Sequence, residues 1–166
     1  MSYFITFSTY GTWLPGSAKG SVDSEHNQYG TQWLPAAAEQ EQQAREAMTQ
    51  SAYTMNPDER EIVCRALVNL AEERGWLLLA AHVRSNHVHL VVQADREPGR
   101  VMSDFKARYS RELTRAGYDD AQRRRWTRHG STRHLFREGE VEAAIRYTLD
   151  EQGSHMAWYA HEPRTK

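Results

Sequence analysis

The sequence has little cysteine, no long apolar run and almost no net charge, and the first two of these absences exclude whole classes of protein. Cys64 is the only cysteine, so the chain can form neither an internal disulfide nor a cysteine-based metal site. No stretch approaches the about 20 apolar residues that span a bilayer. The segment from Met1 to Leu14 lacks a basic start followed by an apolar stretch, so no secretory signal is expected. These features predict a cytoplasmic protein without a membrane partner.

The net charge of −1 hides an uneven distribution of charge along the chain. Residues 1–95 contain 6 basic and 11 acidic residues, residues 96–137 contain 12 and 5, and residues 138–166 contain 3 and 6. A basic region inside a neutral protein suggests a polyanion site, although a solvated Arg-rich helix face gives the same pattern. Arginine outnumbers lysine by 11 to 1 in this central segment. Because arginine makes bidentate phosphate contacts and stacks on bases, the bias modestly favours nucleic acid.

The order of predicted elements indicates an α+β fold in a single domain of 166 residues. It suggests an antiparallel sheet with helices packed on one side. A long loop insertion covers about residues 11–56, where a polar helix over 36–50 is possible, and an irregular tail covers about 154–166. The expected strands are residues 3–10, 76–84 and 87–92, with an irregular strand pair within 123–136. The expected helices are residues 56–74, 101–116 and 138–151.

A histidine pair stands at the centre of the chain, in the sequence His87-Val88-His89. Side chains alternate between the faces of a strand, so His87 and His89 point one way while Val88 and Leu90 point into a core. Two imidazoles at this spacing can share one divalent metal ion. Histidine pairs also occur on exposed strands without any ligand, so spacing alone leaves metal binding open.

A tyrosine and an acid on the last predicted helix complete a candidate catalytic group. Glu151 follows Tyr147 by four residues, so both lie on one helix face. If this helix crosses the sheet near the histidines, Glu151 can supply an oxygen ligand and Tyr147 lies beside the metal. A divalent ion can polarise and orient a phosphate for attack by the tyrosine hydroxyl. The alternative is that Tyr147 is a structural residue at the edge of the helix whose ring only packs against its neighbours.

The stretch Ser85-Asn86-His87-Val88-His89-Leu90-Val91-Val92, followed by the helix that bears Tyr147, resembles the HUH single-tyrosine transposases. The opening Tyr3-Phe4-Ile5-Thr6-Phe7-Ser8-Thr9-Tyr10-Gly11-Thr12-Trp13-Leu14-Pro15-Gly16 is similar to the REP-associated tyrosine transposases of bacteria. This resemblance implies a ferredoxin-like domain that binds DNA hairpins and cuts and rejoins single strands through a covalent 5′-phosphotyrosine. It further implies a nucleoid-associated protein, either a monomer or a homodimer.

By this resemblance, His87 and His89 hold Mg²⁺ or Mn²⁺ and Tyr147 is the nucleophile. The family usually has an amide one turn after the tyrosine, where this chain has Glu151, and Gln152 is the competing third ligand. The predicted DNA-binding surface combines the basic helix with the Arg-rich segment that follows it. Its expected members are Lys106, Arg108, Arg111, Arg123, Arg124, Arg125, Arg128 and Arg133.

Two alternative functions use the same fold. The chain can be a hairpin DNA-binding protein that has kept the fold but lost efficient chemistry, and the discriminator is whether Tyr147→Phe changes anything besides DNA cleavage. It can also be a metal-dependent phosphodiesterase with a water nucleophile, which predicts cleavage without a covalent adduct.

Overall fold

The computed structural model describes residues 1–12 and 38–162. Most of the predicted insertion at 11–56 and the last residues of the predicted tail lie outside the described residues. None of the helices in the described part of the chain is both long and apolar enough to cross a membrane.

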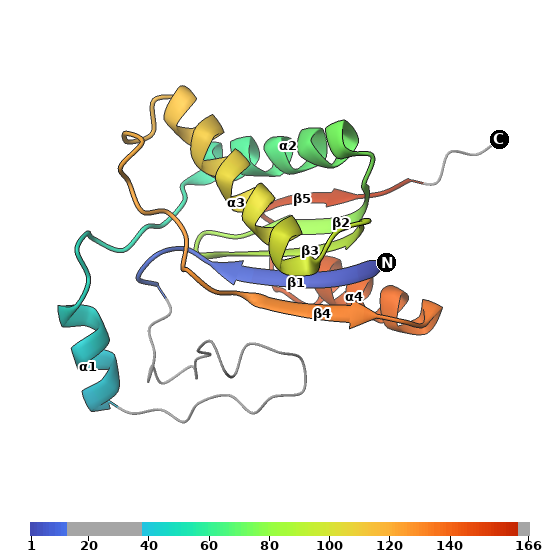
Figure 1. Ribbon diagram of the computed structural model, residues 1–166, viewed down its shortest axis with the longest axis horizontal. Coiled ribbons are helices and arrows are strands. Elements are labelled where there is room, and N and C mark those ends of the chain that lie inside the picture. Colours follow the sequence, from blue (N-terminus) through green and yellow to red (C-terminus); the bar gives the residue numbers. More distant parts are fainter. Residues whose placement is uncertain (13–37, 163–166) are drawn as a thin grey trace.

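Five strands form one antiparallel sheet in the order β4-β1-β3-β2-β5 within the described residues (Figure 1). The strands are β1 (Ser2–Ser8), β2 (Leu77–Val83), β3 (His87–Gln93), β4 (Ser131–Leu135) and β5 (Ala157–Ala160). The helices are α1 (Ala38–Glu46), α2 (Pro57–Arg74), α3 (Pro98–Arg115) and α4 (Glu138–Asp150). The chain order β1-α2-β2-β3-α3-β4 gives the strand order of a ferredoxin-like fold, and β5 extends that sheet at the β2 edge. The α+β prediction is therefore confirmed.

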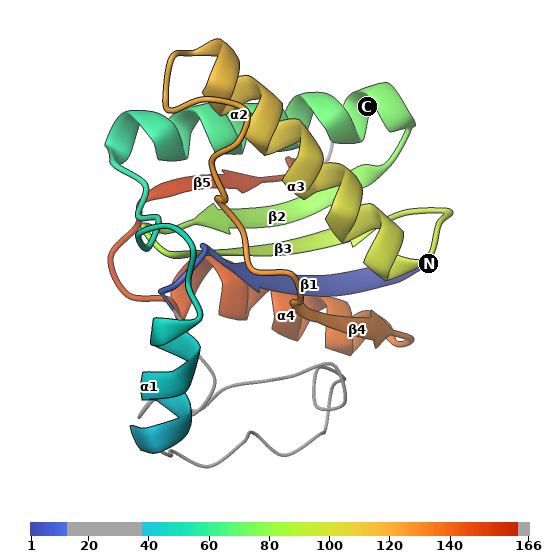
Figure 2. The same cartoon turned by 60° about the vertical axis from the view of Figure 1, so that its left-hand side comes forward.

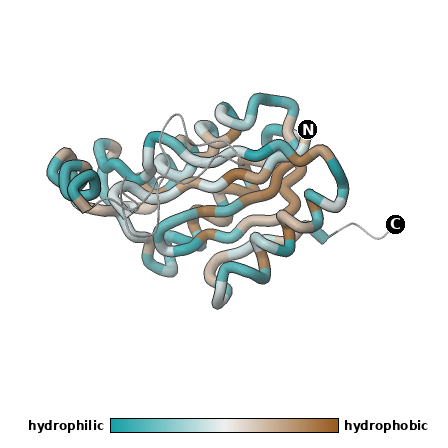
Figure 3. The backbone as a smooth tube through the Cα atoms, turned by 90° about the horizontal axis from the view of Figure 1, so that it is seen from below, coloured by the Kyte–Doolittle hydropathy of each residue, from teal (hydrophilic) through white to brown (hydrophobic). Residues whose placement is uncertain are grey.

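Helices cover both faces of this sheet, which corrects the expectation that they pack on one side. Helices α2 and α3 lie on one face and α4 lies on the other (Figures 1 and 2). The reason is that the central strands are apolar on both faces. Val88 and Leu90 join the large core under α2 and α3, whereas Val91 joins a smaller core with Ala144 of α4. The tube coloured by hydropathy shows this apolar centre within a hydrophilic rim (Figure 3).

Helix α2 begins and ends where the sequence predicts, because both ends are specified locally. The Asn56 side chain accepts a hydrogen bond from the Glu59 backbone N–H, and the Glu59 side chain accepts one from the Asn56 N–H, which is a capping box. Pro57 occupies the first turn, where no N–H is needed. Gly75 ends the helix at φ 68°, a left-handed conformation that suits glycine.

Two predicted irregular regions differ from expectation. The tail contains β5, which pairs with β2 through residues Ala157–Ala160. Four residues are too few to show a clear alternation, so this strand is decided by the free edge of β2. The region 123–136 holds one strand, β4, and an isolated bridge between Thr9 and Trp126, rather than a strand pair. Phe136, directly after β4, is 74% exposed.

Candidate functional site

The two predicted metal ligands lie side by side on the face of β3 that α4 covers. The ring centroids of His87 and His89 are 4.7 Å apart and the ring planes are at 81°. His89 is buried, whereas His87, at the start of the strand, is half-buried. The alternation that the sequence predicted thus places both imidazoles at one location, near the edge of α4.

Each ring has a protein partner at Nδ1. The Thr6 hydroxyl, opposite His89 in the β1–β3 register, lies 2.8 Å from His89 Nδ1. Asn86 Oδ1 lies 2.6 Å from His87 Nδ1. An amide oxygen only accepts, so the neutral His87 ring is protonated at Nδ1 and has its lone pair at Nε2. Orientation of a metal-ligating histidine by a hydrogen bond at its other nitrogen is the usual arrangement in metal sites.

His89 is held in its neutral form. The pKa of His89 is lowered to about 3, mainly by burial and also by the nearby His87 and His82 rings, while the Gln152 side chain opposes the shift. A protonated imidazole has no lone pair for a metal. His89 is therefore a competent nitrogen donor over the whole physiological pH range.

Tyr147 lies next to this pair, as the spacing on α4 predicted. Its ring meets the His89 ring edge to face, with centroids 5.8 Å apart, and contacts the Phe4 ring in the same manner. Thr148 and Ala144 are buried and fix the face that α4 turns to the sheet. Tyr147 itself is 41% exposed, so its side chain is partly accessible from solvent.

The structure does not bring the expected third ligand, Glu151, to the pair. Its carboxylate lies 3.5 Å from the Arg146 guanidinium on the exposed side of the helix end. Instead, the Gln152 side chain is close enough to His89 to raise the pKa of that ring, and its Nε2 donates to the Tyr147 carbonyl at 3.3 Å. Helix α4 ends at Asp150 and Glu151 has φ −106° and ψ 10°, so helical spacing no longer applies there. Within residues 1–12 and 38–162, no three His, Cys, Asp or Glu side chains form a metal-binding group.

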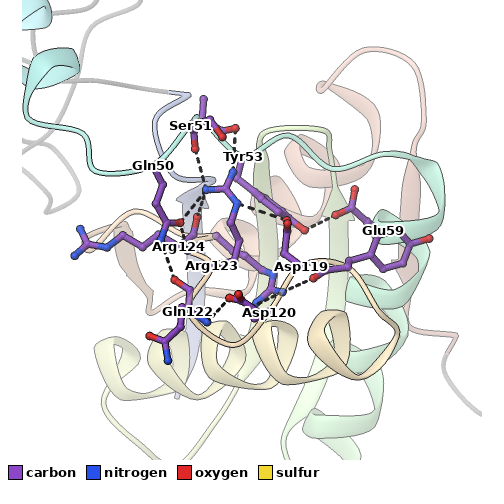
Figure 4. Close-up of polar contacts among 12 residues, drawn as sticks. Gln50, Ser51, Tyr53, Glu59, Asp119, Asp120, Gln122, Arg123 and Arg124 are labelled. Carbon is purple, nitrogen blue, oxygen red and sulfur yellow. Dashed lines mark hydrogen bonds and ion pairs between the residues drawn. The ribbon is translucent and has the colours of Figure 1, made fainter.

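Two arginines predicted to bind DNA, Arg125 and Arg123, instead hold the protein together, and Figure 4 shows the contacts of Arg123. Arg125 is 2% exposed and donates to the backbone carbonyls of Ser110, Tyr118 and Asp120. Arg123 donates to the carbonyls of Ser51 and Ala52, and its guanidinium lies 4.9 Å from the centre of the Tyr53 ring. Both assignments to DNA are corrected by this geometry, because these guanidinium groups are already bonded to backbone carbonyls.

The side chains of Lys106 and Arg108 on α3 also bind other parts of the protein. Lys106 Nζ donates to the carbonyls of Thr127 and His129 at 2.8 and 3.0 Å, and burial lowers its pKa to about 8. Arg108 makes a bidentate pair with Glu73, which joins α3 to α2. Sequence reasoning could not distinguish these residues from surface cations, since their partners are distant in the chain.

The other predicted DNA contacts remain at or near the surface. Arg111, Arg124 and Arg128 are exposed. Arg133 on β4 pairs in register with Phe4, so it faces the same side of the sheet as His89 and Tyr147, and it lies 4.0 Å from Glu140. The basic surface that could face DNA is therefore smaller than the sequence count implied, and Arg133 is the member on the face of the candidate site.

The solved structures that match this chain include two transposases of low similarity. A REP-associated tyrosine transposase bound to a REP hairpin is 10% identical, with a TM-score of 0.49, and the match covers 90% of this chain. This chain spans 65% of that structure's chain, slightly less than two thirds. A proposed transposase from Deinococcus radiodurans R1 is 14% identical, with a TM-score of 0.45 and coverage of 95% and 92% of the two chains. No curated protein matches the chain.

A protein-family model described as IS200-like transposase matches residues 48–142. The match includes both histidines of the candidate site and ends before Tyr147. The matched residues make up more than half of the chain. The chain therefore belongs to the IS200-like transposase family.

Proposed function

We propose that this protein nicks and rejoins single-stranded DNA at hairpin-associated sites through a covalent bond between Tyr147 and a 5′-phosphate. The observation that carries the proposal is the position of Tyr147, whose ring packs against His89 beside the His87–His89 pair. A partly exposed phenol next to two paired imidazoles is the arrangement that metal-assisted nucleophilic attack needs. Such an activity would place the protein with bacterial nucleoid DNA.

The donor set fits a divalent cation such as Mg²⁺ or Mn²⁺. His87 and His89 supply two imidazole nitrogens, and both are oriented at Nδ1 by neighbouring side chains. The Gln152 side chain, which acts on the pKa of His89, would supply an amide oxygen as a hard donor. Imidazole nitrogens favour transition-metal ions and an amide oxygen suits Mg²⁺ and Mn²⁺, so the mixed set favours Mn²⁺ over Mg²⁺, and open coordination positions would remain for phosphate oxygens. When bound, the cation would withdraw charge from the scissile phosphate and orient it for in-line attack.

The chemical step is a transesterification, in which one phosphodiester bond replaces another. The Tyr147 oxygen forms a bond to phosphorus, and the bond from phosphorus to the 3′-oxygen of the preceding nucleotide breaks. The phenol gives up its proton and the departing 3′-oxygen gains one through solvent, so a free 3′-hydroxyl results. Because one phosphodiester replaces another, the bond energy is retained. A 3′-hydroxyl can then attack the phosphotyrosine and rejoin the strand without ATP.

Residues of this chain also determine where the nucleophile lies. Phe4 packs against both the Tyr147 and His89 rings, with centroids 5.8 Å away in each case. The tyrosine and the histidine are therefore held by a common aromatic neighbour on β1. Holding reacting groups in place before the substrate arrives lowers the entropic part of the barrier.

The test is an incubation of labelled hairpin and single-stranded oligonucleotides with Mg²⁺ or Mn²⁺, followed by a denaturing protein gel. A labelled band at the mass of the protein is expected, and it should disappear in Tyr147→Phe and in the presence of EDTA. Tyr159→Phe on β5 is the matched control and should keep the band. Binding without cleavage or adduct would support the DNA-binding alternative instead, and cleavage without adduct would support a nuclease with a water nucleophile.

A further inference from the structure

A third histidine, His82, lies under the end of α4 and is fully buried on β2. It stands directly opposite His89 in the β2–β3 register, so it faces the same side of the sheet as the candidate site. Its hydrogen bonds point to a specific task.

Both ring nitrogens of His82 bond to backbone atoms near the C-terminus of α4. The Met156 N–H donates to Nε2 at 3.1 Å, and the Thr148 carbonyl lies 3.2 Å from Nδ1. Because Nε2 accepts a hydrogen bond, the single ring proton is on Nδ1 and is donated to Thr148. The neutral tautomer thus satisfies both contacts, and neither an apolar side chain nor a charged imidazole would do so.

These contacts belong to a set that closes the last turn of α4. The final four carbonyls of a helix lack partners inside the helix. Here the Tyr147 carbonyl accepts from Gln152, that of Thr148 from His82, and that of Leu149 from His155. Gln152 and His155 belong to the segment that follows the helix. His82 is the member of this set that comes from the sheet, so it ties the turn to the strand beside His89.

We propose that His82 is a positioning residue that holds the Tyr147-bearing end of α4 in register with the His87–His89 pair. The inference rests on the proposed function and deepens it. His82 anchors the residue after Tyr147 through Thr148, and it anchors the return of the chain to β5 through Met156. Gln152 lies between these two anchors, so the same clamp sets the position of the Gln152 amide beside His89.

The alternative is that His82 only adds stability, as any satisfied buried polar group does. The two ideas differ in what happens when the protein is folded and the substrate is saturating. Loss of a positioning contact slows the chemical step, since small displacements of reacting groups reduce rates by up to about 100-fold. Loss of stability alone changes the folded fraction and leaves the rate of the folded protein unchanged.

Three substitutions separate the contacts. His82→Leu removes both hydrogen bonds, His82→Asn retains a donor near Nδ1, and His82→Gln retains an acceptor near Nε2. Val63→Ala on α2 is the control, because Val63 is fully buried on the opposite side of the sheet. Each variant is assayed at the same interval below its own midpoint of thermal unfolding. The measurements are the single-turnover rate of adduct formation at saturating oligonucleotide and Mn²⁺, the oligonucleotide Kd, and hydrogen exchange at the Met156 amide.

We expect His82→Leu to form adduct at least about 10-fold more slowly than Val63→Ala, with an oligonucleotide Kd within about 2-fold of the wild type. His82→Asn should recover more of the rate than His82→Gln, because Thr148 adjoins the nucleophile. Exchange at Met156 should rise in His82→Leu. Equal rates in His82→Leu and Val63→Ala, or unchanged exchange at Met156, would overturn the inference while the wild-type adduct upholds the proposed function. Absence of an adduct in the wild type would overturn both.

Discussion

The Thr6 hydroxyl lies 2.8 Å from Nδ1 of His89, across the β1–β3 register, in the centre of the sheet. If His89 binds metal through Nε2, its Nδ1–H donates to Thr6 and the tautomer is fixed. Thr6→Val keeps the shape and removes the acceptor. We expect this substitution to weaken Mn²⁺ affinity by about 10-fold or more, as is typical for partners that orient a ligand. Calorimetric Mn²⁺ titration measures it.

Thr132→Val is a suitable control for that experiment, because Thr132 pairs with Ile5 and so faces the other side of the same sheet. The control should bind Mn²⁺ like the wild type. If Thr6→Val binds Mn²⁺ as tightly as Thr132→Val does, His89 is not a ligand oriented in this way.

The third oxygen donor is predicted to be Gln152 rather than Glu151. Gln152→Ala should raise the Mn²⁺ concentration that gives half-maximal adduct, since the amide beside His89 is lost. Glu151→Ala should have little effect, because that carboxylate pairs with Arg146 at 3.5 Å and is more than half exposed. Metal titrations of adduct formation compare the two variants. The reverse order of effects would restore Glu151 as the ligand.

Arg125 is predicted to contribute to stability and not to DNA binding. Arg125→Met leaves three backbone carbonyls without their donor, so the free energy of unfolding should fall by about 3 kcal/mol. Urea denaturation gives this value. The dependence of DNA affinity on salt should be unchanged, because no phosphate contact is lost.

Arg128→Met should affect DNA binding and not stability, since Arg128 is exposed. If Arg128 contacts a phosphate, the slope of log affinity against log salt becomes shallower by about 1, with stability unaltered. A shallower slope in Arg125→Met would show that Arg125 reaches DNA after all.

The buried Lys106 should make the free energy of unfolding depend on pH. Burial lowers its pKa to about 8 from the ordinary 10.5. Between pH 8 and 10.5 the unfolded chain therefore holds a proton that the folded protein has released, so this residue makes stability rise with pH in that window. Below pH 8 both states are protonated, and the contribution to the slope vanishes.

The buried Cys64 thiol and the buried tyrosines act in the opposite direction at high pH, because burial raises their pKa. The informative quantity is thus the difference in unfolding free energy between the wild type and Lys106→Met, followed by urea denaturation from pH 7 to 10. This difference should shift in favour of the wild type as the pH rises above 8. A constant difference across the range would contradict the lowered pKa of Lys106.

Features set by near neighbours in the chain were accessible from the sequence. The capping box at Asn56 and the glycine at position 75 fix α2, and the period of two in β3 places His87 and His89 on one face. The period of α4 similarly places Thr148 toward the sheet and Tyr147 beside it. In these cases the conformation follows from contacts within a few residues, so the local pattern is sufficient.

Contacts between distant segments decided the rest. The side of the sheet on which α4 packs depends on apolar residues of several strands that share the second face, among them Ala80, Val91 and Leu135. Arg125 is structural because the carbonyls of Ser110 and Tyr118 surround it in the fold. The direction in which Glu151 points, toward Arg146 and away from the histidines, follows from the point at which α4 ends, and His82 bonds to that end from β2. The sequence thus determined which residues can do the chemistry, and the tertiary structure decided which of them meet.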